Sequence, residues 1–187
     1  MSAEFLLIGL GNPEPQYRRN RHNAGFMAID AIADAWGFGA EQEKYHGLLS
    51  KGVVEGKACL ALKPMTYMNL SGKSVQPVAA FFKIPPQRMI VLHDELDVPF
   101  GKVKVKRGGG SGGHNGIKSI DEAVGQDYIR VRIGIGHPGD KDRVTGHVLG
   151  NYTTDEEAQM KPVFDKVADA LPWLLADDMP KFLQEMA

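Results

Sequence analysis

His22 lies in the sequence Arg-His-Asn-Ala-Gly, residues 21–25, where an irregular stretch gives way to a predicted helix. An unperturbed imidazole titrates at about pH 6.5, so it can accept and return a proton at neutral pH. A carboxylate beside such a ring would fix its tautomer and favour its charged form. His22 is therefore a candidate general base, although a histidine taken alone is more often structural.

Two polar residues follow apolar segments that are predicted as buried strands. Asn12 comes shortly after residues 5–8, and Asp94 comes after residues 89–92. Ligands of open α/β sheets bind beyond the carboxyl ends of the strands. If the two strands are parallel neighbours, Asn12 and Asp94 share one edge of the sheet. His22 follows Asn12 closely in the chain, so the three residues could form one site.

The sequence Gly-Leu-Gly-Asn-Pro-Glu, which begins at Gly9, starts like a dinucleotide-binding fingerprint. Glu14 occupies the position of the third glycine, however, and Pro13 and Pro15 prevent a helix from starting there. The fingerprint needs that helix N-terminus to hold a pyrophosphate, so we reject it. A tight loop that presents Asn12 remains.

Residues 108–116, Gly-Gly-Gly-Ser-Gly-Gly-His-Asn-Gly, are the most unusual segment. Ser111 matches the nucleophile pattern G-x-S-x-G, but that pattern requires a sharp turn directly between strand and helix. A serine esterase that uses Ser111 stays an alternative. Glycines let a backbone approach a ligand closely, and Asn115 would stand at the start of the next helix. The segment predicts a gate or wall of a binding site.

Metal and cofactor chemistry receive little support. None of the six histidines forms an H-E-x-x-H motif, and a single cysteine cannot build a thiolate cluster. We therefore predict no metal and no cofactor. Cys59 lies in an apolar run, which predicts a buried packing role and is compatible with a reducing cytoplasm.

Length and composition indicate one globular domain, residues 1–187. No apolar run approaches 18 residues and no secretory signal is evident, so we expect a cytoplasmic protein without a membrane span. The net charge of −1 divides into about +4 before residue 151 and −5 after it. This asymmetry permits a surface that binds a polyanion but does not require one.

A strictly alternating segment, residues 102–106, places Lys102, Lys104 and Lys106 on one face of a predicted strand. Arg130 and Arg132 alternate in the same way on a later strand. Together with Arg107, they could form one basic stripe for an anionic substrate. An ordinary solvated edge strand, which lysines protect from aggregation, explains the pattern equally well.

Strands and helices alternate along the chain. This alternation predicts a single-domain α/β three-layer sandwich, with a mostly parallel, mixed, twisted sheet and helices on both faces. Asn23 is the predicted cap of the first helix, and the spacing of Thr154 and Glu157 predicts a capping box for a long helix that runs toward Leu175. Besides the segments above, we expect strands at residues 48–54, 57–62 and 129–135, and helices at residues 24–36, 75–82, 117–124 and near Pro180.

Five ordered blocks resemble the signature of bacterial peptidyl-tRNA hydrolases. The blocks cover residues 9–13 with Tyr17 and residues 21–25, then residues 63–72, 93–97, 108–116 and 132–138. The resemblance spans residues 5–150, and the long C-terminal helix fits it too. Glu14 departs from the family, which usually has glycine after Asn-Pro, so the geometry of the Asn12 loop is in question.

The resemblance implies a monomeric enzyme that hydrolyses the ester between a peptide and the 3′-terminal ribose of tRNA, without a metal. Its partner would be peptidyl-tRNA, contacted at the acceptor stem, the 3′ end and the 5′ phosphate. A tRNA-binding protein without catalytic activity is the second alternative. Matched by position, His22 would be the base and Asp94 would orient it. The peptidyl backbone, the water and the oxyanion would be bound by Asn12, Asn69 and Asn115. The substrate would also contact Tyr17, Tyr67, Met68 and His114, and the tRNA phosphates would contact Lys104, Lys106 and Arg132. Asn23 would cap the helix behind His22, and Arg21 would be a surface contact.

Overall fold

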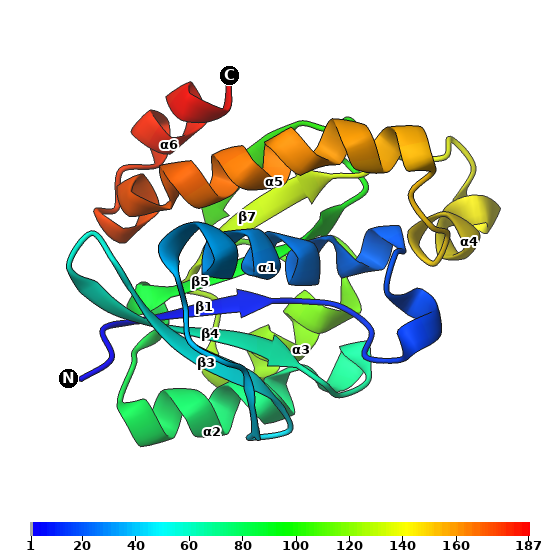
Figure 1. Cartoon of the computed structure of the whole chain (residues 1–187). Helices are drawn as coiled ribbons and strands as arrows, with labels where there is room; N and C mark the ends of the chain where they lie inside the picture. Colours follow the sequence, from blue (N-terminus) through cyan, green and yellow to red (C-terminus); the bar gives the residue numbers. More distant parts are fainter. Residues whose placement is uncertain (1) are drawn as a thin grey trace.

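Short apolar segments form the centre of a seven-stranded sheet in a computed structural model that describes residues 2–187 (Figure 1). The strand order is β2-β3-β4-β1-β5-β7-β6. The strands are β1 (Phe5–Gly9), β2 (Gln42–Lys44), β3 (Gly47–Val54), β4 (Lys57–Pro64), β5 (Met89–Glu95), β6 (Val103–Arg107) and β7 (Ile129–Gly134).

The four central strands run parallel, and the outer strands pair in antiparallel fashion. β1 is parallel to β4 and to β5, and β5 is parallel to β7. The β2–β3, β3–β4 and β6–β7 pairs are antiparallel. The predicted mixed α/β sheet is therefore confirmed, with its parallel pairs confined to the centre. The carboxyl ends of β1 and β5 lie at the same edge, since Gly9 is in register with Leu92.

Helices cover both faces of the sheet, as predicted for a three-layer sandwich. In Figure 1, α1 and α5 lie on one face, and α2 and α3 lie on the other. The helices are α1 (Ala24–Trp36), α2 (Gly72–Phe82), α3 (Asn115–Val124), α4 (Val144–Val148), α5 (Thr154–Leu175) and α6 (Met179–Met186), and short 3₁₀ helices span Pro15–Tyr17, Arg21–Asn23, Met68–Leu70, Pro86–Arg88 and Lys141–Arg143. No helix within residues 2–187 has the length and hydropathy needed to cross a bilayer.

Alternate side chains of the central strands supply two hydrophobic cores. Leu7 of β1 packs in the core beneath α1 and α5, whereas Leu6 and Ile8 pack in the core beneath α2 and α3. This alternation is the period of two that a strand imposes. Cys59 is buried in the first core, as predicted. Burial raises the pKa of its thiol to about 12, so the group stays protonated and unreactive.

Several element boundaries differ from the sequence prediction. The capping box of α5 is made by Thr153 and Glu156, so the predicted Thr154–Glu157 pair is wrong by one residue. β5 extends three residues beyond Leu92, because its pairing with β7 continues as far as Glu95. The short strand β2 and the short helix α4 were not predicted from the sequence.

The start of α1 lies directly against the ends of β1 and β5. A Cβ on Gly25 would collide with the backbone of Leu10 and with the carbonyl oxygen of Leu92. These are backbone atoms of the sheet edge, so they cannot move aside cheaply. Glycine at this position lets α1 begin at the edge where Asp94 emerges.

Gly25→Ala is therefore expected to lower the free energy of unfolding by about 1–3 kcal/mol, the usual cost of overpacking. Urea denaturation measures the change. Gly146→Ala is the matched control, because Gly146 also lies in a helix but has open space around its Cβ position. Equal stability of the two variants would contradict the close packing at Gly25.

Candidate active site

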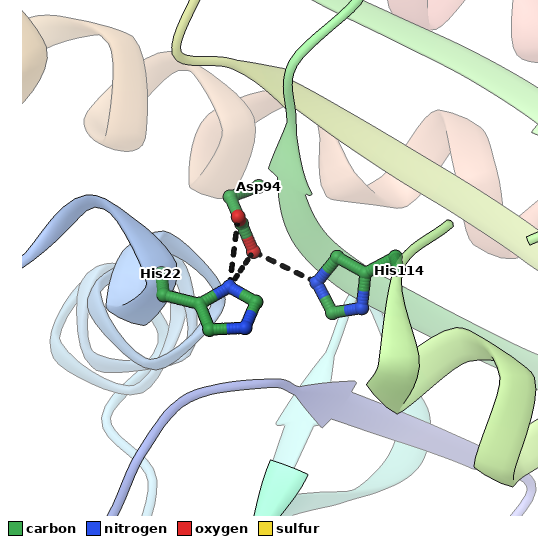
Figure 2. Close-up of side chains that lie close together, drawn as sticks. All are labelled: His22, Asp94 and His114. Carbon is green, nitrogen blue, oxygen red and sulfur yellow. Dashed lines mark hydrogen bonds and ion pairs between the residues drawn. The ribbon is translucent and has the colours of Figure 1, made fainter. Parts of the chain in front are cut away.

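A buried carboxylate joins two histidines at the carboxyl edge of the sheet (Figure 2). Asp94 Oδ2 lies 2.8 Å from His22 Nδ1, and Asp94 Oδ1 lies 2.8 Å from His114 Nε2. Asp94 belongs to β5, His22 to the 3₁₀ helix Arg21–Asn23, and His114 is the N-cap of α3. Three segments that are distant in the sequence therefore meet at one side chain, which is only 3% exposed.

The hydrogen-bond partners define the tautomers of both rings. His114 Nδ1 accepts hydrogen bonds from the backbone N–H groups of Gly116 and Ile117, at 3.1 and 3.3 Å. Its proton must therefore be on Nε2, which donates to Asp94. His22 donates from Nδ1 to the same carboxylate, which leaves the Nε2 lone pair free. An imidazole arranged in this way can take a proton from water.

Charge and burial act in opposite directions on these groups. Burial alone lowers the pKa of His22, but the negative charge of Asp94 outweighs it, so the pKa is raised above its ordinary value. Burial alone raises the pKa of Asp94, but His22 and His114 hold it well below its usual range. The carboxylate therefore stays ionised, and His22 becomes a somewhat stronger base than a free imidazole.

His93 is buried behind the site. Its ring meets the ring of His114 edge to face at 5.1 Å, and its Nδ1 donates to the backbone oxygen of Asp94. Burial and then the neighbouring His114 lower its pKa to about 3. His93 is thus a neutral packing group rather than an acid or base.

Nitrogen and oxygen atoms of His22, Asp94 and His114 lie within 4.8 Å of one another, close enough to suggest metal ligands. A metal on His114 Nε2 would displace its proton, while Nδ1 already accepts two backbone N–H groups. The ring would then have to bind as an imidazolate. The donor set therefore favours a hydrogen-bond network over a metal site.

The side chain of Asn23 fixes the Asn12 loop from the N-cap position of α1. Its Oδ1 accepts from the backbone N–H of Asn12 at 2.6 Å, and its Nδ2 donates to the backbone oxygen of Asn12 at 3.1 Å. Asn23 occupies the predicted N-cap position of α1, but its side chain makes no capping hydrogen bond to that helix. Glu14 has φ −63°, which suits any residue, so the departure from glycine causes no strain in this loop.

A cleft of about 320 Å³ opens beside the Asp94 network. One wall is the glycine-rich segment, which contributes Gly112 and Gly113 and continues into Asn115. Residues of α4 form another wall, and His22 and Asp94 also contact the space. The structure thus places the glycine-rich segment in a wall, as the sequence suggested. The complete lining comprises His22, Asp94, Glu95, Leu96, Gly112, Gly113, His114, Asn115, Val144, Thr145 and Val148.

Arg130 supports this glycine wall from beneath. It is 2% exposed and donates to the carbonyl oxygens of Gly108 and Gly110, each at 2.7 Å. Its predicted place in an exposed basic stripe was therefore wrong. Alternation along the strand gave the correct face, but no sequence signal distinguishes a buried arginine from an exposed one at this position.

The other basic residues remain on one face of β6 and β7. Lys104 is opposite Arg132, and Lys106 is opposite Arg130. Arg132 donates to Glu95 at 2.9 Å, whereas Lys106 forms no ion pair with the residues that the structure describes. Burial and then the charges of Arg130 and Arg132 lower the pKa of Lys106. Unbalanced positive charge of this kind favours binding of an anion.

The remaining predicted site residues, within residues 2–187, are not part of the lining of this cleft. Tyr67 is 68% exposed, and Asn69 is exposed in the 3₁₀ helix that packs on α3. Met68 is buried beside Gly116, so it supports the start of α3. Tyr17 lies in another 3₁₀ helix. Within residues 2–187, no hydrogen bond connects the side chains of Tyr17, Asn69 or Asn12 to Asp94.

Ser111 lacks the surroundings of an activated nucleophile. It lies between the end of β6 at Arg107 and the start of α3 at Asn115, so it does not stand on a direct strand-to-helix turn. Its hydroxyl accepts from the Gly113 N–H at 3.4 Å. No histidine side chain hydrogen-bonds to that hydroxyl in the described part of the chain.

The sequence and the fold of this chain are both similar to those of known peptidyl-tRNA hydrolases. A family model described as peptidyl-tRNA hydrolase matches residues 6–187. The peptidyl-tRNA hydrolase of Acidiphilium cryptum is 56% identical over 183 residues, covering 97% of this chain and 95% of the relative. That of Gluconobacter oxydans is 53% identical and covers 97% of both chains. A crystal structure of peptidyl-tRNA hydrolase from Acinetobacter baumannii has a TM-score of 0.92 at 42% identity, covering 100% of this chain and 95% of that one.

Asp94→Asn would alter both of the hydrogen bonds that Asp94 accepts from His22 and His114. An asparagine offers one acceptor oxygen, which His114 requires because its Nδ1 is engaged. The amide N–H₂ would then face His22 and move the His22 proton to Nε2, where it blocks the base. We expect kcat to fall by about 10²–10⁴.

The pH dependence of kcat/KM provides a second readout. Asp94 raises the pKa of His22, so removal of its charge should move the acidic limb of the profile to lower pH. Asp169→Asn, at an exposed position of α5, is the control for loss of one negative charge. An unshifted acidic limb in Asp94→Asn would contradict the coupling.

Proposed function

We propose, since the chain belongs to the peptidyl-tRNA hydrolase family, that it cleaves the ester between a peptide and the 3′-terminal ribose of tRNA. The observation that carries the proposal is the His22–Asp94 pair beside a cleft, with the Nε2 lone pair of His22 left free. Hydrolysis of prematurely released peptidyl-tRNA would return the tRNA for reuse.

In the first step, His22 Nε2 accepts a proton from water as the water oxygen attacks the ester carbonyl carbon. Asp94 stabilises the imidazolium that forms, because its carboxylate accepts the Nδ1–H bond. The carbonyl oxygen becomes an oxyanion. The positioned base supplies about 10²–10⁴ in rate.

In the second step, the bond between the carbonyl carbon and the ribose 3′-oxygen breaks. His22 returns its proton to that oxygen, so the products are a peptide carboxylic acid, which ionises, and tRNA with a free 3′-hydroxyl. The ester is a reactive acyl group, so water with a positioned base is sufficient. The cycle leaves His22 neutral and ready for another water molecule.

Amide side chains would bind the peptide and the developing charge. Asn115 lines the cleft at the first turn of α3, where the backbone N–H groups also favour negative charge. Asn12 is held by Asn23, and Asn69 stands on the segment packed against α3. We assign these three amides to the peptide backbone, the water and the oxyanion, because neutral amides can both donate and accept hydrogen bonds.

The basic face of β6 and β7 would hold the tRNA. We assign Lys104, Lys106 and Arg132 to phosphates of the acceptor stem and to the 5′ phosphate. Lys106 carries the strongest argument, since Arg130 and Arg132 lie near it and it forms no ion pair with the residues that the structure describes. The glycine-rich segment follows β6 directly along the chain. The lysines assigned to phosphates and the wall of the cleft therefore belong to one continuous stretch of backbone.

The proposal includes a monomeric enzyme of the cytoplasm. The buried cysteine is compatible with a reducing compartment, and the two cores bury the apolar faces of the helices within one chain. Tyr17, Tyr67 and Met68 would shape the substrate site, with Met68 acting from beneath α3. His114 donates to Asp94 and also lines the cleft, so we assign it both to the support of that carboxylate and to contact with the substrate.

His22→Ala is expected to reduce release of the acyl-amino acid from N-acyl-aminoacyl-tRNA by at least about 10²-fold, because the base is lost. Binding of deacylated tRNA, measured by filter retention, should change less than twofold. His46→Asn is the control, since His46 is exposed in a turn at φ 58°, which asparagine tolerates. Wild-type turnover in His22→Ala would remove His22 from the base role.

Lys106→Ala is expected to raise KM and to leave kcat nearly unchanged, because a phosphate contact contributes to binding alone. The slope of log KM against log salt concentration should become shallower by about one. Lys161→Ala on α5 removes an equal charge from a residue that is 77% exposed and pairs with Asp165. An effect of Lys106→Ala on kcat alone would argue against the phosphate role.

Ser111→Ala separates the hydrolase from a serine esterase. The proposed mechanism predicts wild-type turnover within about twofold and no labelling of Ser111 by a fluorophosphonate, because no basic side chain among residues 2–187 hydrogen-bonds to its hydroxyl. Labelling with loss of activity would establish the esterase instead. A protein that binds tRNA but releases no peptide would indicate the binding function alone.

A further inference from the structure

One wall of the cleft is α4, a helix of only five residues that lies outside the two helical layers covering the sheet. It contributes Val144, Thr145 and Val148 to the cleft. Such a short helix has little stability of its own. Its position must therefore be set by contacts with neighbouring segments.

The side chain of Arg21 supplies one of these contacts, and its second hydrogen bond goes to α5. Its Nη1 donates to the backbone oxygen of His147 at 3.1 Å, and its Nη2 donates to Glu156 Oε1 at 3.1 Å. The backbone N–H of Arg21 also donates to the Gly150 oxygen at 3.0 Å. The side chain is 14% exposed and does not line the cleft. The sequence interpretation of Arg21 as a surface contact was therefore wrong.

Glu156 connects this contact to the fixed part of the molecule. It is the acidic member of the α5 capping box and accepts from the Thr153 N–H at 2.9 Å. α5 packs along α1 over the sheet. The Arg21 guanidinium thus joins the end of α4 to the start of a long, well-anchored helix. Its own backbone precedes His22 directly.

We propose that Arg21 is a positioning residue that holds the α4 wall at its distance from His22. This inference rests on the proposed function, since α4 borders the cleft assigned to the substrate. Arg21 acts through α4 and not through the base, because the His22–Asp94 bond involves neither its guanidinium nor α4. Loss of the guanidinium should therefore loosen the wall and weaken substrate binding.

Arg21→Met tests the inference because methionine keeps an apolar stem but removes both donors. KM for N-acyl-aminoacyl-tRNA should rise at least fivefold, with kcat and the acidic limb of the pH profile unchanged. Arg19→Met is the matched control: Arg19 pairs with Glu157 at 2.6 Å, but the side chains are 50% and 36% exposed. Arg19→Met should leave KM within twofold of wild type.

Hydrogen exchange gives a readout that does not depend on activity. The Leu149 and Gly150 amides bond to Thr145 and His147 oxygens at the end of α4. Exchange at these amides should be at least tenfold faster in Arg21→Met than in wild type or Arg19→Met. Faster exchange in an enzyme that released no peptide would refute the proposed function but preserve the structural role of Arg21.

The remaining outcomes are also decisive. Arg21→Lys can reach one acceptor at a time, so its KM should lie between those of wild type and Arg21→Met. If Arg21→Met does not fold, the KM of Arg21→Lys decides the question. A wild-type KM in the deciding variant, an equal rise in Arg19→Met, or a fall in kcat with a shifted acidic limb would overturn the assignment of Arg21 to the α4 wall.

Discussion

The buried carboxylate of Asp94 is stabilised by the two imidazole N–H groups that it accepts. A charge removed from water costs several kcal/mol unless it is paired and hydrogen-bonded. The strand that carries Asp94, the turn that carries His22 and the start of α3 must therefore converge for the edge of the sheet to be stable. The same pairing holds one proton on each ring and leaves the outer nitrogen of His22 as a base.

Around this unit, irregular backbone is fixed by side chains that do not contact the cleft. Asn23 binds both backbone groups of Asn12, Arg130 binds the carbonyls of Gly108 and Gly110, and Arg21 binds the carbonyl of His147. Each supplies hydrogen bonds that a regular strand or helix would otherwise provide. The Asn12 loop and the glycine-rich segment thus gain defined positions without becoming regular structure.

Sequence patterns identified the long helices and every strand except the short, exposed β2, because apolar periodicity is a local property. They also placed Asn12 and Asp94 at a common edge, since parallel strands end together. The capping box was displaced by one residue because Thr153 and Thr154 each have a glutamate three positions later. The roles of Asn23, Arg21 and Arg130 were missed, because each depends on partners 11 to 135 residues away that a single sequence does not reveal.

The turn that carries His22 makes one contact with a residue nearby in the sequence and another with a residue far away in it. The Asn23–Asn12 contact closes a loop of 11 residues, whereas His22 and Asp94 are 72 residues apart. Short loops close at lower entropic cost than long ones, so the local contact can form before the sheet is complete. During refolding, the loop and α1 can therefore be native while the histidine still lacks its carboxylate. Recovery of activity consequently reports the pairing of β1 with β5, and not the appearance of helical structure.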